Sequence, residues 1–145
     1  MTKKGEIIMR VEQATVVRKE WSSVCDSVIR DKPQFIKRTR DEMVLSSYET
    51  MLSLLSGYRF TASSCKEKDG SVSLALNEID LVVNGETIEL AKREMGSAIL
   101  EYAEEYYENY ALYSHSPNRK DHVPYVMKAL LMQKSDVIGE EIVCA

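Results

Sequence analysis

The chain has 145 residues, with a hydrophobic fraction of 44%, a charged fraction of 29% and a formal net charge of −4. These values are typical of a folded globular protein with one ordinary domain or two small ones, and they exclude a disordered chain. No apolar run reaches the ~18 residues that a membrane-spanning helix needs, and the first residues lack a signal-peptide core, so we expect a cytoplasmic protein. Three irregularly spaced cysteines, Cys25, Cys65 and Cys144, fit a reducing compartment better than a disulfide framework.

The net charge hides a difference between the two halves. Through Phe60 there are eleven basic and eight acidic residues, a net of +3, whereas the rest has eight basic and fifteen acidic residues, a net of −7. Such asymmetry is a known hint of one end that faces nucleic acid and one end with another task. Ordinary solvated surfaces explain the count equally well.

The first half predicts a strand, a helix, a hairpin and a second helix. Residues 6–13 have strand character, and from Val17 the apolar residues recur at spacings of three and four. The resulting helix should end near Asp31, because Pro33 disfavours helical geometry at the residue before it. The remaining predictions are a strand from Phe35, a turn at 40–41, a strand over 42–45, a capping box at 46–49 and a helix that stops at Gly57.

The second half predicts paired strands followed by helices. Strands are expected over 58–65, 72–76 and 79–83, with turns at 69–70 and 84–85. Thr87 is a plausible N-cap for a long helix to Leu112, whose apolar side includes Ile88, Ala91, Met95, Ala98, Ile99, Tyr102, Ala103, Tyr106 and Tyr110. Two shorter helices should follow, over 123–132, with Pro124 in the first turn, and over 135–142.

The first half resembles the Phd/YefM family of antitoxins. The resemblance covers roughly residues 8–57 and rests on the order of elements, on the helix that ends before Pro33, on the strand PQFIKR and on the hairpin leading to SSYETMLSLL. The segment KEKDGSVSLALNEIDLVVNGETIELAKR in the second half is similar to the HicB-like or RelB-like pattern. Members of the Phd/YefM family form homodimers that bind operator DNA, and they neutralise toxins such as RelE-like ribonucleases or Doc-like kinases.

The resemblance implies an α+β protein in two domains. Residues 1–57 would form a β-α-β-β-α dimerisation and DNA-binding domain, and residues 58–145 a toxin-neutralising domain with a small sheet and a long helix. Clustered cations suit phosphate, because each neutralised phosphate releases counterions. The candidate DNA-binding residues are Arg10, Arg18, Lys19, Lys37, Arg38 and Arg40, of which Arg18 and Arg38 best match the family's positions.

The sequence EYAEEYYENYALY in the long helix predicts a protein-binding surface. Its glutamates would repel phosphate, whereas tyrosines on an acidic helix suit an interface with a small basic protein. The candidate toxin-binding residues are Glu101, Tyr102, Glu105, Tyr106, Glu108 and Tyr110. The alternative, that these tyrosines belong to the domain's own core, is left open.

The sequence gives little support to catalysis, a metal or a cofactor. His115 and His122 are seven positions apart, which is not a usual spacing for metal ligands. No phosphate-binding loop, nucleophile elbow or zinc-binding histidine pair is present. We therefore expect a non-enzymatic type II antitoxin that also represses its own operon, with an interaction adaptor lacking a toxin partner as the alternative.

Overall fold

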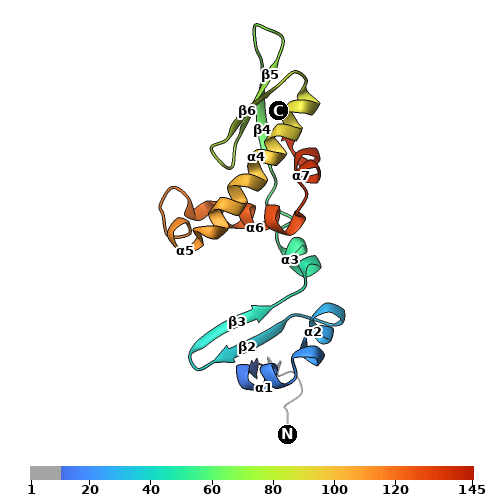
Figure 1. Ribbon diagram of the computed structural model, residues 1–145, viewed down its shortest axis with the longest axis vertical. Coiled ribbons are helices and arrows are strands. Elements are labelled where there is room, and N and C mark those ends of the chain that lie inside the picture. The colour runs from blue at the N-terminus through green and yellow to red at the C-terminus, as the bar shows by residue number, and fades with distance from the viewer. Residues whose placement is uncertain (1–10) are drawn as a thin grey trace, which may run out of the picture. The chain divides into compact units, whose positions relative to one another are not determined.

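The computed structural model describes residues 11–145, which form two compact units (Figure 1). The N-terminal unit ends at Met51 and the C-terminal unit begins at Leu52, so the division falls inside helix α3 (Tyr48–Leu54). Both units combine helices with a small sheet, which confirms the α+β prediction. The part of the first predicted strand before Val11 lies outside the described residues.

The N-terminal unit has a three-stranded sheet in the order β1-β2-β3. Its elements before α3 are β1 (Val11–Gln13), α1 (Ala14–Lys19), α2 (Trp21–Arg30), β2 (Gln34–Arg38) and β3 (Asp41–Leu45). Strand β1 runs parallel to β2, and β2 and β3 form an antiparallel hairpin whose connection is made by Thr39 and Arg40. Within residues 11–51 the buried apolar side chains are Val17, Val28 and Ile36, which is a small core for a sheet with two helices.

Two local predictions for this unit were wrong. The single predicted helix is divided at Glu20, whose φ of −110° and ψ of 30° interrupt the helical backbone between α1 and α2. The cap of α3 is one residue later than predicted, because the Ser47 hydroxyl accepts a hydrogen bond from the Thr50 amide at 3.1 Å. Ser46 instead donates to the carbonyl of Ser47.

The C-terminal unit has a four-stranded sheet in the order β6-β5-β4-β7. Its elements are β4 (Thr61–Lys66), β5 (Val72–Leu76), β6 (Val82–Gly85), α4 (Ile88–Glu108), α5 (Tyr110–Tyr113), the 3₁₀ turn η1 (Lys120–His122), α6 (Val123–Met132), α7 (Ser135–Glu141) and β7 (Val143–Cys144). Neighbouring strands are antiparallel except for β4 and β7. Helix α4 contacts β5, β6, α6 and α7, and so it is the centre of this unit (Figure 1).

Several local signals in the second half predicted this arrangement correctly. Thr87 caps α4, because its hydroxyl accepts a hydrogen bond from the Leu90 amide at 3.2 Å. Gly70 adopts a φ of 89° in the turn between β4 and β5, a conformation that favours glycine. Pro124 lies in the first turn of α6, where its missing N–H has no helical partner to lose.

Three predictions for the second half were wrong. The long helix ends at Glu108 and not at Leu112, because Asn109 breaks the backbone and a separate turn, α5, follows. Residues 84–85 were predicted as a turn, but they pair with β5 as the end of β6. The last helix stops at Glu141, and the chain continues into β7, a strand that the sequence did not predict.

The core of the C-terminal unit lies between the sheet and the helices. Fully buried side chains include Phe60, Leu74, Met95, Ile99 and Ile138. Helices α4 and α7 approach closely through two glycines: a Cβ on Gly96 would lie 2.1 Å from the carbonyl oxygen of Ser135, and one on Gly139 would lie 2.6 Å from that of Lys92. Only a residue without a side chain fits at either position.

Candidate functional site

The candidate DNA-binding residues that the structure describes are at the closed end of the β2–β3 hairpin and in the last turn of α1. Arg38 ends β2, Arg40 lies in the connection, and both are exposed, whereas Lys37 is half-buried. Lys37 is opposite Glu42 in the strand register, and Arg38 is opposite Asp41. Within residues 11–145 neither of these two pairs forms an ion pair, whereas Lys128 and Glu141 do.

The hairpin cations do not all face one way. Side chains alternate along a strand, so Arg38 is on the same sheet face as Ile36, and Lys37 is on the opposite face. Ile36 is buried and lines a groove together with Arg18, which brings Arg18 close to the hairpin. Lys19 is exposed in the last turn of α1, and Arg10 lies outside the described residues.

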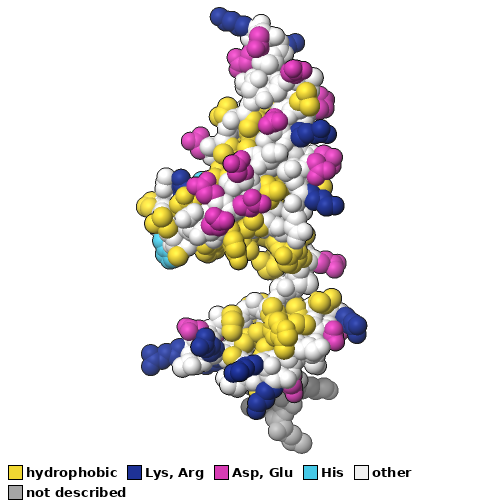
Figure 2. Space-filling view, in the orientation of Figure 1, with side chains coloured by type: hydrophobic (Ala, Val, Ile, Leu, Met, Phe, Trp, Pro, Cys, Tyr) yellow, Lys and Arg dark blue, Asp and Glu magenta, His cyan; other side chains and the backbone are white. Residues whose placement is uncertain are grey.

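An apolar groove of about 390 Å³ lies beside these cations. It is lined by side chains from α1, α2 and the hairpin, among them Trp21, which is 53% exposed, and Val44, which is 55% exposed. Figure 2 shows hydrophobic side chains gathered on this face of the N-terminal unit, with Lys and Arg at its edge. Exposed apolar surface of this kind is typical of an interface with another protein.

The acidic side chains of α4 lie on its solvent-facing side (Figure 2). Glu101, Glu104, Glu105 and Glu108 are all exposed, and Glu105 accepts a hydrogen bond from the Tyr113 hydroxyl at 3.0 Å. None of the four makes an ion pair within the described part of the chain. Their negative charge is therefore free to attract a basic partner.

Tyr106 cannot belong to a binding surface in this fold, contrary to our prediction. Its side chain is 0% exposed, and its hydroxyl donates a hydrogen bond to the carbonyl of Arg119 at 2.9 Å. The ring is surrounded by Tyr102, Tyr110 and Tyr113, with ring centroids 5.4 to 6.0 Å away. Tyr106 is therefore part of the core that fixes the loop after α5.

Tyr102 and Tyr110 take intermediate positions. Tyr110 is 37% exposed, so part of its ring can still reach a partner. Tyr102 is half-buried, and its hydroxyl lies 2.7 Å from Nδ1 of His122. Burial raises the pKa of Tyr102 above its ordinary value and lowers the pKa of His122, to which the nearby Arg119 guanidinium also contributes. Arg119 itself lies over the Tyr113 ring at 4.0 Å.

Two further apolar residues in this part of the sequence are exposed, of which Leu112 was not predicted to bind a partner. Tyr107 is 64% exposed on α4, and Leu112 is 66% exposed on α5. They lie near the exposed glutamates in sequence, at the end of α4 and in the segment after it. Tyr107 follows the buried Tyr106 by one position, which places it about 100° around the helix and away from the core.

Other kinds of site find no support in the described residues. No group of three or more His, Cys, Asp or Glu side chains is arranged to hold a metal ion. None of the described helices has the length and apolar character needed to cross a bilayer. His122 is engaged with Tyr102, and His115 is in the loop after α5 with Nδ1 2.7 Å from the Ala111 carbonyl.

The geometry agrees with two similarities to known proteins. The chain is similar to a crystal structure from Syntrophomonas wolfei subsp. wolfei, described as the antitoxin part of an inferred toxin/antitoxin system, with 34% identity and a TM-score of 0.88 over 94% of this chain and 99% of that one. No curated protein matches the sequence. A family model described as PHD-like, antitoxin of toxin-antitoxin, RelE/RelB, TA system, matches residues 8–143. The chain therefore belongs to this PHD-like family of antitoxins.

Proposed function

We propose that this antitoxin neutralises a basic, RelE-like ribonuclease through its C-terminal unit and represses its own operon through its N-terminal unit. In this proposal the protein acts in the cytoplasm as a homodimer of the Phd/YefM type. The observation that carries the proposal is charge that has no ion-pair partner within residues 11–145: cations at the hairpin end of one unit and glutamates on α4 of the other.

The apolar groove of the N-terminal unit supports the homodimer. Among residues 11–51 the buried apolar side chains are Val17, Val28 and Ile36, while Trp21 and Val44 remain more than half exposed. If these exposed apolar side chains were buried against a second copy of the chain, the dimer would gain the core that a domain of this size lacks. Light scattering at tens of micromolar should therefore report a dimer, and a monomer would contradict this part of the proposal.

DNA binding is tested at Arg38. The variant Arg38→Gln should weaken binding to the DNA upstream of the gene, and the slope of log affinity against log salt should flatten by about one unit, because one phosphate contact is lost. The matched control is Arg93→Gln, which removes the same charge from an exposed position on α4. Equal losses in both variants would show a general charge effect and not a contact by the hairpin.

Toxin binding is tested on the outer side of α4. Replacing Glu101, Glu104 and Glu108 by Lys should slow association with the toxin by about tenfold or more, and most at low salt, because steering charges act mainly on the association rate. Glu105 is left intact because it accepts the Tyr113 hydrogen bond. The control changes three exposed acids elsewhere in this unit, Glu67, Asp80 and Glu86.

The toxin for this assay is the product of the neighbouring gene, expressed with and without the antitoxin. Growth protection by the wild type, and slow association of the α4 variant only, would support the proposal. If the control triple slows association as much as the α4 triple, the acidic surface of α4 is not the toxin-binding site.

A further inference from the structure

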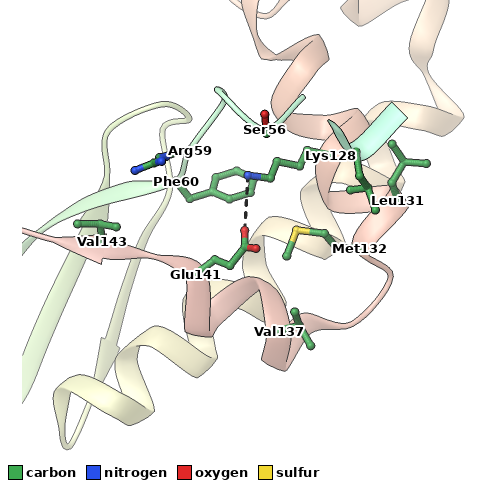
Figure 3. A pocket seen from close by; sticks show the side chains of 10 residues that line it. Ser56, Arg59, Phe60, Lys128, Leu131, Met132, Val137, Glu141 and Val143 are labelled. Atoms are coloured by element: carbon green, nitrogen blue, oxygen red, sulfur yellow. Dashed lines mark ion pairs between the residues drawn. The ribbon is translucent and has the colours of Figure 1, made fainter. Parts of the chain in front are cut away.

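A cavity of about 650 Å³ opens in the C-terminal unit beside the start of β4 (Figure 3). The side chains that line it come from the end of α3, the end of α6 and α7. Others come from Arg59 and Phe60, just before β4, and from Val143 in β7. This volume is within the range of sites that hold small molecules, about 300 to 1,000 Å³. None of the functions proposed above uses the cavity.

Lys128 provides a buried positive charge at the cavity. Its side chain is 10% exposed, and its ammonium donates to the Tyr58 carbonyl at 2.9 Å. Glu141 lies 3.5 Å away on α7, as the dashed line in Figure 3 shows. An ammonium has three N–H donors, so the contacts with Tyr58 and Glu141 leave one donor for a further acceptor.

Arg59 adds a second cation to the cavity lining. It is exposed and has no carboxylate partner within residues 11–145. With Lys128 and Glu141, the lining therefore carries one net positive charge. Two smaller hollows of the same unit have the opposite balance: carboxylates outnumber cations around Glu89 and Lys92, and again around Glu67 and Lys68.

The rest of the lining is mainly apolar. Phe60 forms one wall of the cavity, and Leu131, Met132, Val137 and Val143 complete much of the remainder (Figure 3). A ligand that suits this lining has an apolar body, because binding then removes the apolar surfaces of both ligand and cavity from water. It also needs an anionic group to match the free cation.

We propose that this cavity binds an amphipathic carboxylate, meaning an apolar body that ends in a carboxylate group. The Arg59 guanidinium can hold a carboxylate through two parallel hydrogen bonds, and Lys128 can supply its remaining N–H. The apolar body then lies against Phe60, Leu131 and Val137. Such a group is found both in a fatty acid and at the C-terminus of a polypeptide that ends in an apolar residue.

The full-length chain is titrated with each probe, and binding is measured by calorimetry and by the NMR chemical shifts of the backbone amides. The probes are decanoate, the peptide acetyl-Leu-Phe with a free carboxylate, and the same peptide as its amide. We expect saturable binding of at least one acid probe, with shifts around Phe60, Lys128 and Val137, and at least tenfold weaker binding of the amide. Tighter binding of the peptide acid than of decanoate identifies a polypeptide end as the source, and the reverse identifies a fatty acid.

Arg59→Gln should weaken binding of the acid by about tenfold, the usual effect of losing a charge-assisted hydrogen bond. The matched control, Arg93→Gln, removes an exposed arginine that does not line the cavity, and it should bind like the wild type. The proposal is overturned if no acid probe saturates, if acid and amide bind equally, or if Arg59→Gln retains full affinity. None of these outcomes bears on toxin or DNA binding.

Discussion

Tyr106 and Tyr107 are adjacent on α4, yet their rings lie in opposite surroundings, one in the core and one at the surface. The Tyr106 ring is fully buried and the Tyr107 ring is 64% exposed. Replacing each of them should therefore separate a loss of stability from a loss of toxin binding. Tyr106→Phe removes only the hydroxyl, which donates to the Arg119 carbonyl at 2.9 Å.

The expected magnitudes follow from these surroundings. Loss of the Tyr106 hydroxyl leaves a carbonyl without its donor in a half-buried place, which costs about 1 to 2 kcal/mol. Tyr106→Ala also removes the buried ring and should cost about 3 to 5 kcal/mol. For a unit of this size, each kcal/mol lowers the midpoint of thermal unfolding by roughly 4 to 8 °C. Tyr107→Ala should change the free energy of unfolding by less than about 0.5 kcal/mol.

The assay is thermal unfolding followed by circular dichroism, combined with the kinetics of toxin binding. Under the proposed function, Tyr107→Ala should dissociate from the toxin about tenfold faster or more, because exposed aromatic rings are frequent interface anchors. Tyr106→Phe should bind normally at temperatures where it is folded. An unchanged midpoint for Tyr106→Phe, or a large loss of stability for Tyr107→Ala, would refute the assignment of the two rings.

Two further predictions concern the packing and the pH response of the C-terminal unit. Gly96→Ala should destabilise it by about 1 to 3 kcal/mol in urea unfolding, because the new Cβ would meet the Ser135 carbonyl on α7. The control Ser97→Ala, on the exposed side of α4, should be neutral or slightly stabilising. The pKa of His122 is lowered in the folded state, so stability should be full above its unfolded value of about 6.5 and should fall as the pH drops below it. His122→Asn should reduce the difference in unfolding free energy between pH 7.5 and 5.5, and an unchanged difference would contradict this assignment.

The sequence predicted the elements that depend on short-range chemistry. The Thr87 cap, the Gly70 turn and the proline at the start of α6 each follow from one or two residues, and the structure contains all three. The break at Glu20 was missed because the apolar spacing continues from Val17 through Trp21. Such a break changes the backbone without changing the pattern.

The sequence was misleading where a residue serves a contact that is distant in the chain. Gly85 looked like part of a turn, but a Cβ there would lie 2.4 Å from the Ala91 amide nitrogen, so the glycine allows β6 to approach α4. Strand β7 was missed because it is only two residues long and pairs with β4, far earlier in the sequence. Neither partner can be identified from local residues.

The candidate binding residues show the same limit. The helical period places Tyr106 on the same side of α4 as Met95, and this side faces the core. The acidic neighbours of Tyr106 in the sequence do not change the side on which its ring lies. The glutamates were easier to predict, because a carboxylate without a partner is rarely buried. The exposure of the charged side chains was therefore predictable, and that of the individual tyrosines was not.

Each unit has its own sheet, and the core of the C-terminal unit is complete between Phe60 and Ile142. A fragment of residues 52–145 should therefore fold alone, with a cooperative unfolding transition. Under the proposed function it should protect cells from the toxin without repressing the operon, because the hairpin cations are absent. A start at residue 52, and not at 58, keeps Leu52 and Ser56, which line the cavity of this unit. If the fragment folds but does not protect, while residues 1–57 do, the proposed roles of the two units are reversed.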